Sequence, residues 1–589
     1  MNPRKKQHLK LNTEGGIVSE EEIVGNLMNQ AFIDKIIRLK GTIKDQSHNT
    51  ELRSTNTSVT SVTKFDLETV NDSFVGKVIK SLKSKSSSGY DGVSGSILKS
   101  VQDILRTPLA HIINTSIVTG KFPTPWKSAH VVPIHKKGDK MSTTNYRPVS
   151  LLAVSSKVLE SVAQGQISTF CESNGLLPTG QHGFRKGRST TTALVDLHDH
   201  IQLCLAEGLY VAVLIFDLSA AFDTLSSDTL NKKLRSMGFE EKTLGWIESF
   251  MCNRKQSVKV GQTLSQPVTV NTGVPQGSIL SPLLYLLYVS DMPEQIDNSK
   301  VISFADDTTL IITARSVSEL KKKAEKEAAK TLQYMGNNGL VANADKTGLL
   351  VIRPKAVKEE EPLSIKVGDS IVVESSSERV LGLQITSSLN WTDHIIKVQN
   401  NIRMKTCMMR QIATKLPGVD LSCVLHGLIM STVRYGIALY GTLPNERGNL
   451  SGELQSLQVR INNAVRLLLG VKKIDQVPIK ELLERANVLS VQQIYGQTLL
   501  NLVWTTLKFG MNQLNTYIKP KKREEEDITT RSQTRQDLDT HMCKRKLITK
   551  TACKIWNASP DNIRNSLSNT IPPKQLINNF VISKYYMSN

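Results

Sequence analysis

Short apolar runs alternate with amphipathic stretches along most of the chain. A carboxylate ends one of these apolar runs, and two carboxylates interrupt another. Leu209 to Phe216 is a continuous apolar run that ends at Asp217. A run of this kind is typical of a strand buried on both faces. Val301 to Ile312 contains two β-prone runs on either side of Asp306 and Asp307. This second pattern predicts a hairpin with the two aspartates at its tip.

These carboxylates suggest a metal site. A carboxylate at the end of a buried strand is unfavourable unless it is paired or bound to a metal. Adjacent carboxylates repel each other unless a cation lies between them, and hard oxygen ligands suit Mg²⁺. One strand-end carboxylate and a carboxylate pair form the ligand set that two-metal phosphoryl transfer needs. Two other interpretations stay open, a solvated polar turn for Asp306 and Asp307 and a helix N-cap for Asp217.

The remaining pattern predicts helices and strands around these runs. Ile279 to Val289 predicts a mostly buried helix with Pro282 in its first turn. The apolar stripe from Leu320 to Met335 predicts an amphipathic helix with solvated lysines. Val131 to Ile134 predicts a strand at a sheet edge, because Pro133 cannot donate a hydrogen bond. Further helices that contain arginine are predicted for Ile395 to Leu416, Leu421 to Leu439 and Leu454 to Leu469.

Composition narrows the class of protein. A chain of 589 residues is too long for one core, so several subdomains are expected. The formal net charge of +21 indicates a polyanionic partner. The sequence shows no membrane-spanning run and no signal-like start, so we expect an intracellular protein of the nucleus or cytoplasm without a membrane partner. The seven cysteines are scattered and never spaced as Cys-x-x-Cys, which indicates reduced thiols without a disulfide framework or zinc knuckle.

Three motifs in this order resemble the palm of a reverse transcriptase. They are FDLSAAFDTL from Phe216 to Leu225, TGVPQGSILSPLLYLLYVSDMP from Thr272 to Pro293, and FADDTTL from Phe304 to Leu310. The resemblance is to the non-LTR, LINE-type retrotransposon enzymes of the Jockey-like group, and it covers the chain from about residue 65 onward. It implies an α+β right-hand polymerase that copies RNA into DNA by extending a primer 3′-hydroxyl with dNTPs.

Together, the pattern and the resemblance divide the chain into five segments. Residues 1–63 are polar and expected to be partly disordered, with one helix around Glu20 to Leu39. The fingers are expected at 64–208, the palm with its antiparallel sheet at 209–388, the helical thumb at 389–480, and a helical C-terminal extension at 481–589 with a charged linker near 519–536.

The resemblance assigns catalytic roles to four residues. Two Mg²⁺ ions, for which Mn²⁺ can substitute, are expected to bind Asp217, Asp306 and Asp307 and to serve the attacking hydroxyl and the leaving pyrophosphate. Lys346 lies in a stretch that resembles the next palm motif, which implies a general acid for pyrophosphate. A simple surface lysine is the alternative for Lys346.

The resemblance also implies a nucleotide site. A fingers lysine and a following arginine reach over the triphosphate in this family, and Lys140 and Arg147 match them, although lysines at 136 and 137 compete for the first role. Phe222 matches the aromatic residue that excludes a 2′-hydroxyl, with an ordinary core aromatic as the alternative. Gln276 lies in a glycine-flanked loop that the family places against the nucleotide and the templating base.

Two further segments are expected to contact nucleic acid. Arg185 and Arg188 lie in a glycine-spaced loop before a helix predicted from Thr191 to Cys204, where amides and arginines make an anion site that the resemblance assigns to the template. Leu381 and Gly382 lie in a hairpin that resembles the primer grip. The basic helices beyond it are expected to hold an RNA–DNA hybrid through its shape and phosphates.

The implied partners are an RNA template, a DNA primer or target, dNTPs and the element's own RNA in a ribonucleoprotein. The sequence departs from the family in two respects. We find no room for the upstream endonuclease, and we find no Cys-His knuckle. Two alternatives remain: a catalytically silent nucleic-acid-binding relic, and another template-directed polymerase such as a group II intron maturase. Phe222 argues against ribonucleotide use.

Overall fold

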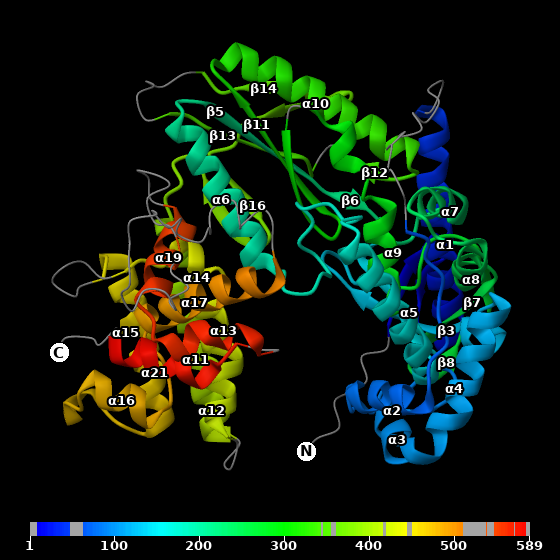
Figure 1. Ribbon diagram of the computed structural model, residues 1–589, viewed down its shortest axis with the longest axis horizontal. Coiled ribbons are helices and arrows are strands. Elements are labelled where there is room, and N and C mark those ends of the chain that lie inside the picture. Colours follow the sequence, from blue (N-terminus) through cyan, green and yellow to red (C-terminus); the bar gives the residue numbers. More distant parts are fainter. Residues whose placement is uncertain are drawn as a thin grey trace, which may run out of the picture. The chain divides into compact units, whose positions relative to one another are not determined.

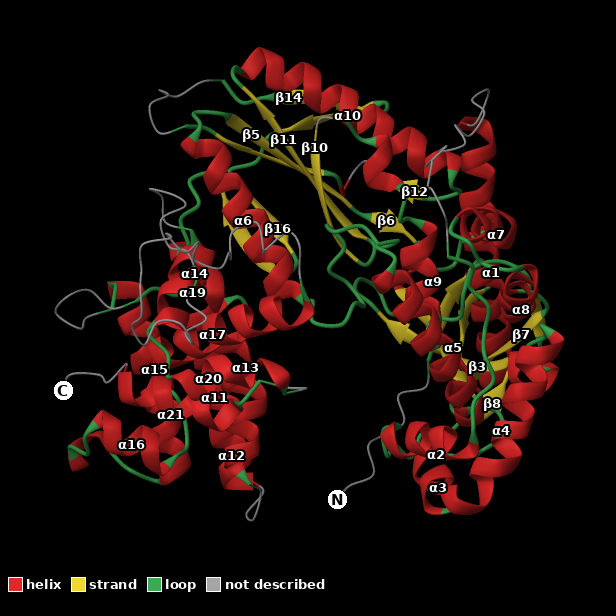
Figure 2. Ribbon diagram, viewed as in Figure 1, coloured by secondary structure: helices red, strands yellow, loops and turns green. Residues whose placement is uncertain are grey.

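The structure is a computed structural model, and it describes only part of the chain. The described residues are 9–46, 63–297, 299–342, 346–354, 361–415, 420–443, 450–510, 538, 547–569 and 572–584. They fall into two compact units, whose helices and strands are shown in Figures 1 and 2. The first unit consists of Met1–Pro178, Asp217–Ile296 and Ala329–Asn343, and the second of Thr179–Phe216, Asp297–Ala328 and Ala344–Asn589.

A four-stranded antiparallel sheet forms the centre of the second unit. Its order is β10-β11-β5-β13, so that the apolar run β5 has a neighbour on each side. Val211 and Val213 are buried on one face of β5, and Ala212 and Leu214 are buried on the other. The strand predicted to be buried on both faces is therefore confirmed. The strands are β5 (Tyr210–Phe216), β10 (Ser299–Phe304), β11 (Asp307–Ala314) and β13 (Gly348–Ile352).

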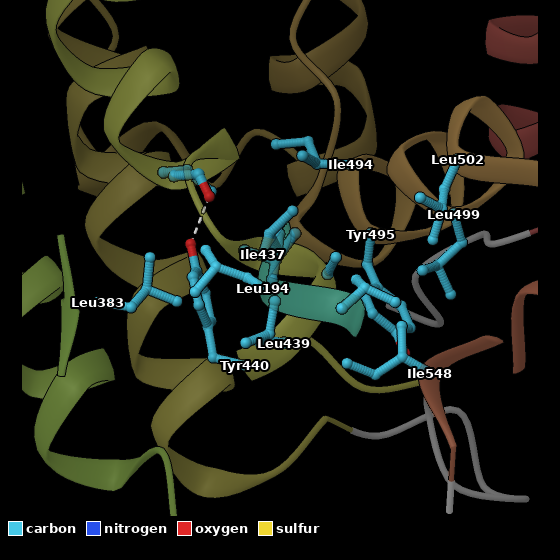
Figure 3. Packing of buried hydrophobic residues seen from close by; sticks show 14 of the residues in the cluster. Leu194, Leu383, Ile437, Leu439, Tyr440, Ile494, Tyr495, Leu499, Leu502 and Ile548 are labelled. Carbon is cyan, nitrogen blue, oxygen red and sulfur yellow. Dashed lines mark hydrogen bonds between the residues drawn. The ribbon is translucent and has the colours of Figure 1, made fainter. Parts of the chain in front are cut away.

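One face of this sheet shares a hydrophobic core with the helices of the same unit. Helix α6 packs against β10, β11 and β5. Its residue Leu194 lies in the same cluster as Ile437 and Tyr495 (Figure 3). Besides α6 (Thr190–Ala206), the helices here are α11 (Thr392–Lys415), α12 (Leu421–Val424), α13 (Ser431–Arg434), α14 (Ile437–Tyr440), α15 (Gly452–Leu469), α16 (Ile479–Arg485), α17 (Val491–Phe509), α19 (Ile548–Asn557), α20 (Asp561–Arg564) and α21 (Lys574–Lys584).

The helix predicted from Leu421 to Leu439 is interrupted in the structure. A π-helical turn, Leu425–Met430, joins α12 to α13, and the chain then bends at Gly436, whose φ is +72°. Glycine adopts this left-handed conformation without steric cost. The bend separates α13 from α14, and the hydroxyl of Tyr440 in α14 donates to the carbonyl of Val433 (Figure 3).

Two hairpins complete the second unit. In the hairpin of β16 (Ser377–Val380) and β17 (Leu383–Thr386), the register is Val380 to Leu383. The second hairpin consists of β14 (Ser364–Val367) and β15 (Ser370–Val373). Helix α10 (Val317–Asn337) contributes residues to both units. Its predicted apolar stripe is confirmed, because Leu320, Ala324, Ala328 and Met335 are buried.

The first unit is built on a mixed sheet of order β4-β3-β7-β8, with β9 also paired to β7. The predicted edge position of the strand that contains Pro133 is wrong, because β3 lies between β4 and β7. The pairing with β7 covers only Ser128–Val131, so Pro133 lies beyond it and no donor is missing. The strands are β3 (Ser128–His135), β4 (Tyr146–Leu152), β7 (Arg254–Val260), β8 (Thr263–Leu264) and β9 (Val268–Val270).

Helices cover this sheet, and small ladders extend the unit. The predicted helix with Pro282 in its first turn is confirmed as α9. The helices are α1 (Glu21–Gln46), α2 (Asp72–Ser81), α3 (Gly95–Ser100), α4 (Gln102–Thr119), α5 (Val154–Ser173), α7 (Ser227–Ser236), α8 (Glu241–Met251) and α9 (Ser281–Tyr288). The ladders are β1 (Leu11–Thr13) with β2 (Gly16–Val18), and β6 (Leu218–Ser219) with β12 (Val341–Ala342).

The predicted N-terminal helix is confirmed and is packed onto the sheet. Helix α1 lies against β7 and β8. Asn29 of α1 is 1% exposed and donates to the hydroxyl of Ser265 and to the carbonyl of Gln266. Residues 1–8 and 47–62, and the charged linker expected near 519–536, lie outside the described residues. Every helix among the described residues is too short or too polar to cross a membrane.

Candidate active site

The hairpin between β10 and β11 carries two of the predicted catalytic carboxylates. Phe304 pairs with Asp307, so the two-residue tip is Ala305–Asp306. The predicted tip of Asp306 and Asp307 is therefore wrong by one residue, and Asp307 is the first residue of β11. Ala305 has a φ of +59°, which costs a non-glycine residue on the order of 1–3 kcal/mol. The surrounding contacts must compensate this strain.

The ladder between β5 and β11 places Asp217 at the same end of the sheet as the hairpin tip. Phe216 pairs with Thr308 as the outermost pair of that ladder. Asp217 and Asp307 are the next residues on these two strands. Asp217 and Asp306 are half-buried and Asp307 is exposed. The N-cap interpretation of Asp217 is wrong, because the strand β6 follows it and Ser226 caps the next helix, α7.

Lys346 also belongs to this end of the sheet. On the other side of β5, Gly348 of β13 pairs with Ile215. Lys346 precedes Gly348 by two residues, and it is exposed. The register is compatible with an acid near the reacting phosphates, and also with an ordinary surface lysine. Its role stays a prediction.

The chemistry of the carboxylates fits Mg²⁺ bound together with a substrate. The described residues contain no group of three or more His, Cys, Asp or Glu side chains arranged to hold a metal. Mg²⁺ in polymerase sites is usually bound by one or two carboxylates together with substrate phosphates and waters, and not by a cage of protein ligands. Asp217 and Asp307 are hard oxygen donors that lie next to the outermost pair of the ladder, Phe216 with Thr308, and they meet that requirement.

A loop of the second unit packs against the hairpin tip and supports it. Gln181 forms a parallel bridge with Ser303, and its side chain contacts the tip. Its Oε1 accepts from the amides of Gly183 at 2.8 Å and Ala305 at 3.0 Å, and its Nε2 donates to the carbonyl of Ala305 at 3.3 Å. A Cβ on Gly183 would lie 2.3 Å from the amide nitrogen of Ala305, so this close approach requires glycine.

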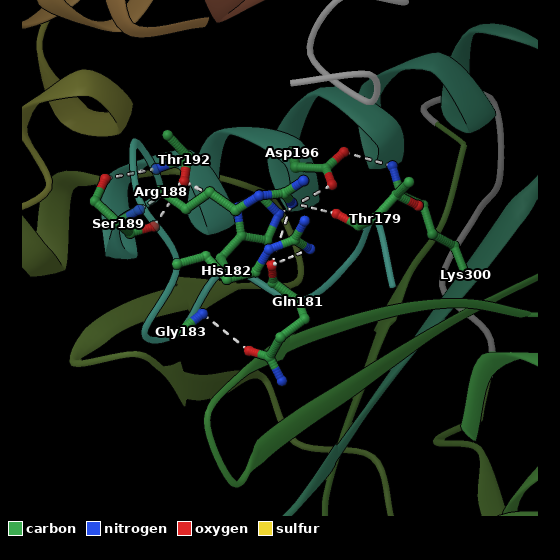
Figure 4. Close-up of polar contacts among 10 residues, drawn as sticks. Thr179, Gln181, His182, Gly183, Arg188, Ser189, Thr192, Asp196 and Lys300 are labelled. Carbon is green, nitrogen blue, oxygen red and sulfur yellow. Dashed lines mark hydrogen bonds and ion pairs between the residues drawn. The ribbon is translucent and has the colours of Figure 1, made fainter. Parts of the chain in front are cut away.

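His182 has a structural role in this loop. Its Nδ1 lies 2.9 Å from the hydroxyl of Thr192, and its Nε2 lies 3.5 Å from Asp196 (Figure 4). Burial lowers the pKa of His182, although Asp196 acts in the opposite direction. Burial by itself would raise the pKa of Asp196, but the bond from His182 and the charge of Lys300 outweigh it and hold the pKa below its usual value. Lys300 belongs to β10, so this network ties the hairpin to α6.

The predicted anion site at the start of α6 is largely occupied by the protein itself. Ser189 accepts from the amide of Thr192 in a capping box. Arg185 donates to the carbonyl of Gln181, and Arg188 donates to the carbonyls of Gln181 and Thr179 (Figure 4). Both arginines are half-buried. They hold the loop that supports the hairpin, while template contact stays a prediction for them.

In the first unit, the predicted triphosphate residues lie on one hairpin. Arg147 is exposed on β4, where it pairs with Ile134. Lys140 is exposed in the loop between β3 and β4, and its carbonyl accepts from Tyr146 at 2.6 Å. Lys136 and Lys137 are exposed in the same loop, so the structure leaves the choice among the three lysines open.

Gln276 is bound to a carboxylate that sequence reasoning did not select. Its Nε2 donates to both oxygens of Asp223, at 2.8 and 3.0 Å. Burial raises the pKa of Asp223, while the bond from Gln276 and the charges of Arg254 and Arg147 act in the opposite direction. Arg147, Gln276 and Asp223 therefore gather in one region of the first unit. A small open pocket there is lined by Lys35, Pro148, Asp223, Arg254, Gln256 and Gln276, among others.

Phe222 and the Gln276 loop are joined by the backbone. The amide of Val274 donates to the carbonyl of Phe222 at 2.9 Å. The half-buried ring of Phe222 lies 4.8 Å from that of Tyr285 in α9. These contacts fix the position of Phe222 beside the loop. They agree with a residue that limits the space for a sugar, and also with a core aromatic.

Buried polar residues also hold the loop, and sequence reasoning missed them. Glu160 of α5 is 1% exposed and accepts from the hydroxyl of Ser278 at 2.6 Å and the amide of Ile279 at 2.7 Å. Arg254 donates to the carbonyls of Thr272 and Gly273. No spacing marks these residues, because their partners are far away in the sequence.

The hairpin that resembles the primer grip has Leu381 and Gly382 as its turn. Both have positive φ, +45° and +86°. The hydroxyl of Tyr435 donates to the carbonyl of Leu381, which anchors the turn to the helices of the second unit. Contact with a primer stays a prediction.

Comparison with known proteins places this geometry in a family. Residues 134–385 match the family described as Reverse transcriptase (RNA-dependent DNA polymerase). The probable RNA-directed DNA polymerase from transposon BS of Drosophila melanogaster is 27% identical over 403 residues, 66% of this chain and 44% of the relative. The RNA-directed DNA polymerase from mobile element jockey of the same species is 25% identical over 397 residues, 66% of this chain and 43% of the relative.

The chain thus spans less than half the length of these curated relatives. A solved telomerase structure from Candida albicans, in complex with a telomeric RNA fragment, covers 63% of this chain and 68% of its own at 14% identity and a TM-score of 0.32. The expected α+β class is confirmed by the antiparallel sheets and helices, and the family match agrees with a right-hand polymerase. Residues 134–385 therefore match the reverse transcriptase family, and about two thirds of the chain is similar to the RNA-directed DNA polymerases of transposon BS and mobile element jockey.

Proposed function

We propose that this protein is an RNA-directed DNA polymerase that extends a primer 3′-hydroxyl with dNTPs. One observation carries the proposal. The ladder that ends at Phe216 and Thr308 brings Asp217 to the end of the sheet where the hairpin presents Asp306 and Asp307. This pattern lies inside the region that matches the reverse transcriptase family.

The three carboxylates are proposed to hold the metal ions. Bound Mg²⁺, or Mn²⁺ in its place, would make the primer hydroxyl a better nucleophile and neutralise charge that develops on the leaving pyrophosphate. Asp217, which follows β5, and Asp306, in the hairpin turn, would supply ligands from two segments, and Asp307, the first residue of β11, would add negative charge at the same edge. Lys346 is proposed to protonate the pyrophosphate, a contribution of roughly 10²–10⁴-fold for a positioned acid.

The nucleotide is proposed to bind in the first unit. Arg147, with Lys140 or a neighbouring lysine, would contact the triphosphate, because a guanidinium can bind phosphate oxygens in a forked geometry. Gln276 already contacts Asp223, and its loop is held in place by Glu160. Phe222 is proposed to limit the space at the sugar and so to favour deoxynucleotides. Its backbone bond to Val274 couples that position to the loop.

The proposed nucleic-acid partners are an RNA template and a DNA primer or target. Arg185 and Arg188 would serve the template through the loop that they hold, and Leu381 and Gly382 would contact the primer end. The net charge of +21 favours any polyanion and does not by itself identify one. Assembly with the element's own RNA, and a location in the nucleus or cytoplasm, belong to the same proposal.

Primer extension by the Asp217→Asn variant tests the function. Removal of this charged ligand should lower dNTP incorporation on an RNA template by more than about 10²-fold, while RNA binding stays near that of the wild type. Asp369→Asn, at an exposed turn between β14 and β15, is the matched control and should keep full activity. Extension by Asp217→Asn at the wild-type rate would refute the site.

The same assay separates the two alternatives. If the protein is a silent relic, the wild type itself binds RNA but extends no primer. A template-directed polymerase that copies DNA or uses ribonucleotides would prefer a DNA template or NTPs to an RNA template with dNTPs. Each reaction is run on both templates with each nucleotide set, so that all three functions give different patterns.

A further inference from the structure

We infer that Gln181 is a positioning residue for the catalytic hairpin, an inference that rests on the proposed function. Its side-chain amide is 3% exposed and lies against the strained residue of the turn. It binds both backbone polar groups of Ala305, the amide through Oε1 and the carbonyl through Nε2. The peptide groups on both sides of Ala305 are thus fixed by one side chain. Asp306 is attached directly to the second of them.

The geometry explains how Gln181 can control the carboxylate without contacting a substrate. The peptide that contains the carbonyl of Ala305 also contains the amide of Asp306, so rotation of that plane swings the Cα–Cβ bond of Asp306. A misplacement of about 1 Å at a catalytic group can cost on the order of 10²-fold in rate. An amide that binds both ends of Ala305 opposes such a rotation.

Gln181 is itself held on both sides. The amide of His182 donates to the carbonyl of Ser303 at 2.8 Å, and the amide of Ser303 donates to the carbonyl of Gly180 at 2.9 Å. The segment around Gln181 is thus paired to β10 through a single parallel bridge at Ser303. Figure 4 shows Gln181 beside Gly183, with His182 directed toward α6. The network of His182, Asp196 and Lys300 then ties both the segment and β10 to that helix.

The chain offers a matched control in the first unit. Gln166 binds the backbone of Glu68 in the same two-pronged way, with its Oε1 accepting from the amide and its Nε2 donating to the carbonyl, both at 2.9 Å. It is remote in sequence from the hairpin and from every proposed catalytic residue. Gln181→Leu and Gln166→Leu therefore remove the same chemical interaction, and only the first removes it from the turn that carries Asp306.

Two measurements on the full chain test the inference. In primer extension, Gln181→Leu should lower kcat at least tenfold and raise the Mg²⁺ concentration for half-maximal rate several-fold, with KM for dNTP within about twofold of the wild type. Hydrogen exchange should speed up at least tenfold in peptides that span residues 299–310 and stay unchanged over 190–206. Gln166→Leu should alter none of these quantities.

The outcomes separate a failure of the inference from a failure of the proposed function. Unchanged exchange in the hairpin of Gln181→Leu, or unchanged kcat and Mg²⁺ dependence in an active enzyme, would overturn the positioning role. A wild type that extends no primer would refute the proposed function. In that case, the hydrogen exchange of the hairpin by itself decides whether Gln181 positions the turn. If Gln181→Leu does not fold, Gln181→Glu replaces it. This variant keeps the acceptor for Ala305 and Gly183 but loses the donor, so its hairpin exchange should lie between those of wild type and unprotected backbone.

Discussion

At the scale of single residues, the candidate nucleotide loop depends on a carboxylate that is buried among neutral donors. Glu160 accepts from the hydroxyls of Ser156 and Ser278 and from the amide of Ile279. Charged groups in the interior are costly unless several hydrogen bonds satisfy them. Glu160 meets this condition by tying α5 to the loop that carries Gln276. The protonation of Glu160 is therefore linked to the contacts that hold this loop.

The stability of the wild type should depend on pH through Glu160. Burial raises the pKa of this carboxyl above its ordinary value of 4.5, so the folded chain binds the proton more tightly than the unfolded chain. The free energy of unfolding therefore falls as pH rises from 4.5 through the raised pKa, by at most about 1.4 kcal/mol per pH unit, and it recovers as pH falls again. A glutamine side chain cannot titrate in this range, so the Glu160→Gln variant should lack this dependence.

Denaturant unfolding at pH 5, 6.5 and 8 measures this difference. The free energy of unfolding of the wild type, relative to Glu160→Gln, should be highest at pH 5 and lowest at pH 8. Glu248→Gln, at an exposed position of α8, is the control and should follow the wild type throughout. Parallel curves for wild type and Glu160→Gln would contradict the expectation.

At the scale of elements, most of the predicted strands and helices are present in the structure. The turns and the order of strands in the sheets were harder to predict, because they depend on contacts with residues that are distant in the sequence. The apolar run of β5 and the stripe of α10 could be predicted because their periodicity is local. The hairpin tip was misplaced by one residue because Ala305 has a conformation that glycine or asparagine usually adopts. The distant Gln181 binds both backbone groups of Ala305 and so supports that turn.

The strand that contains Pro133 shows the same limit. The expectation of an edge strand followed from the missing amide of proline. The structure pairs β3 with β7 only as far as Val131, so the proline lies where no donor is needed on that side. Likewise, the motif residues Asp217, Asp306 and Asp307 were selected from the sequence. The residues that hold their surroundings, such as Gln181 and Glu160, are defined only by contacts over more than 100 positions.

Helix α1 provides a prediction at this scale. The buried Asn29 joins α1 to the loop after β8 through Ser265 and Gln266, and it accepts from Gln256 of β7 at 2.8 Å. Asn29→Ala removes the bonds to Ser265 and Gln266 and leaves the side-chain amide of Gln256 without this acceptor, so it should lower the free energy of unfolding of the first unit by about 1–3 kcal/mol. Gln30→Ala, one residue along on the exposed face, should change it by less than about 0.5 kcal/mol. Chemical denaturation compares the two, and equal small effects would show that α1 is not part of the folded unit.

At the scale of the whole molecule, the question is whether the C-terminal helices of the second unit share one core with its sheet. Trp556, Ile563 and Val581 lie in the same hydrophobic cluster as Leu194 of α6 and the sheet strand β5. The indole of Trp504 donates to the hydroxyl of Ser566 at 3.1 Å. A separate appended domain would have its own core. The shared cluster therefore predicts that these helices and the four-stranded sheet unfold together.

Asp199 makes this expectation testable. It is 0% exposed on α6 and accepts from the amides of Ile548 and Thr549, both at 2.9 Å, so it caps the start of α19 from a distance of about 350 positions in the chain. A carboxylate at a helix N-terminus also interacts favourably with the helix dipole. Asp199→Ala leaves two buried donors unsatisfied and should lower the free energy of unfolding by at least about 2 kcal/mol. Asp369→Ala, at an exposed turn, should change it by less than about 0.5 kcal/mol.

Hydrogen exchange then distinguishes one cooperative unit from two. If the extension is part of the core, Asp199→Ala should speed exchange in β5 as well as in α19, because both open in the same transition. Faster exchange confined to residues 547–584, with β5 unchanged, would mean that the extension opens on its own. The first result would give the buried carboxylate of Asp199 a structural role. By binding two amides of α19, it would stabilise the sheet at whose end Asp217 lies.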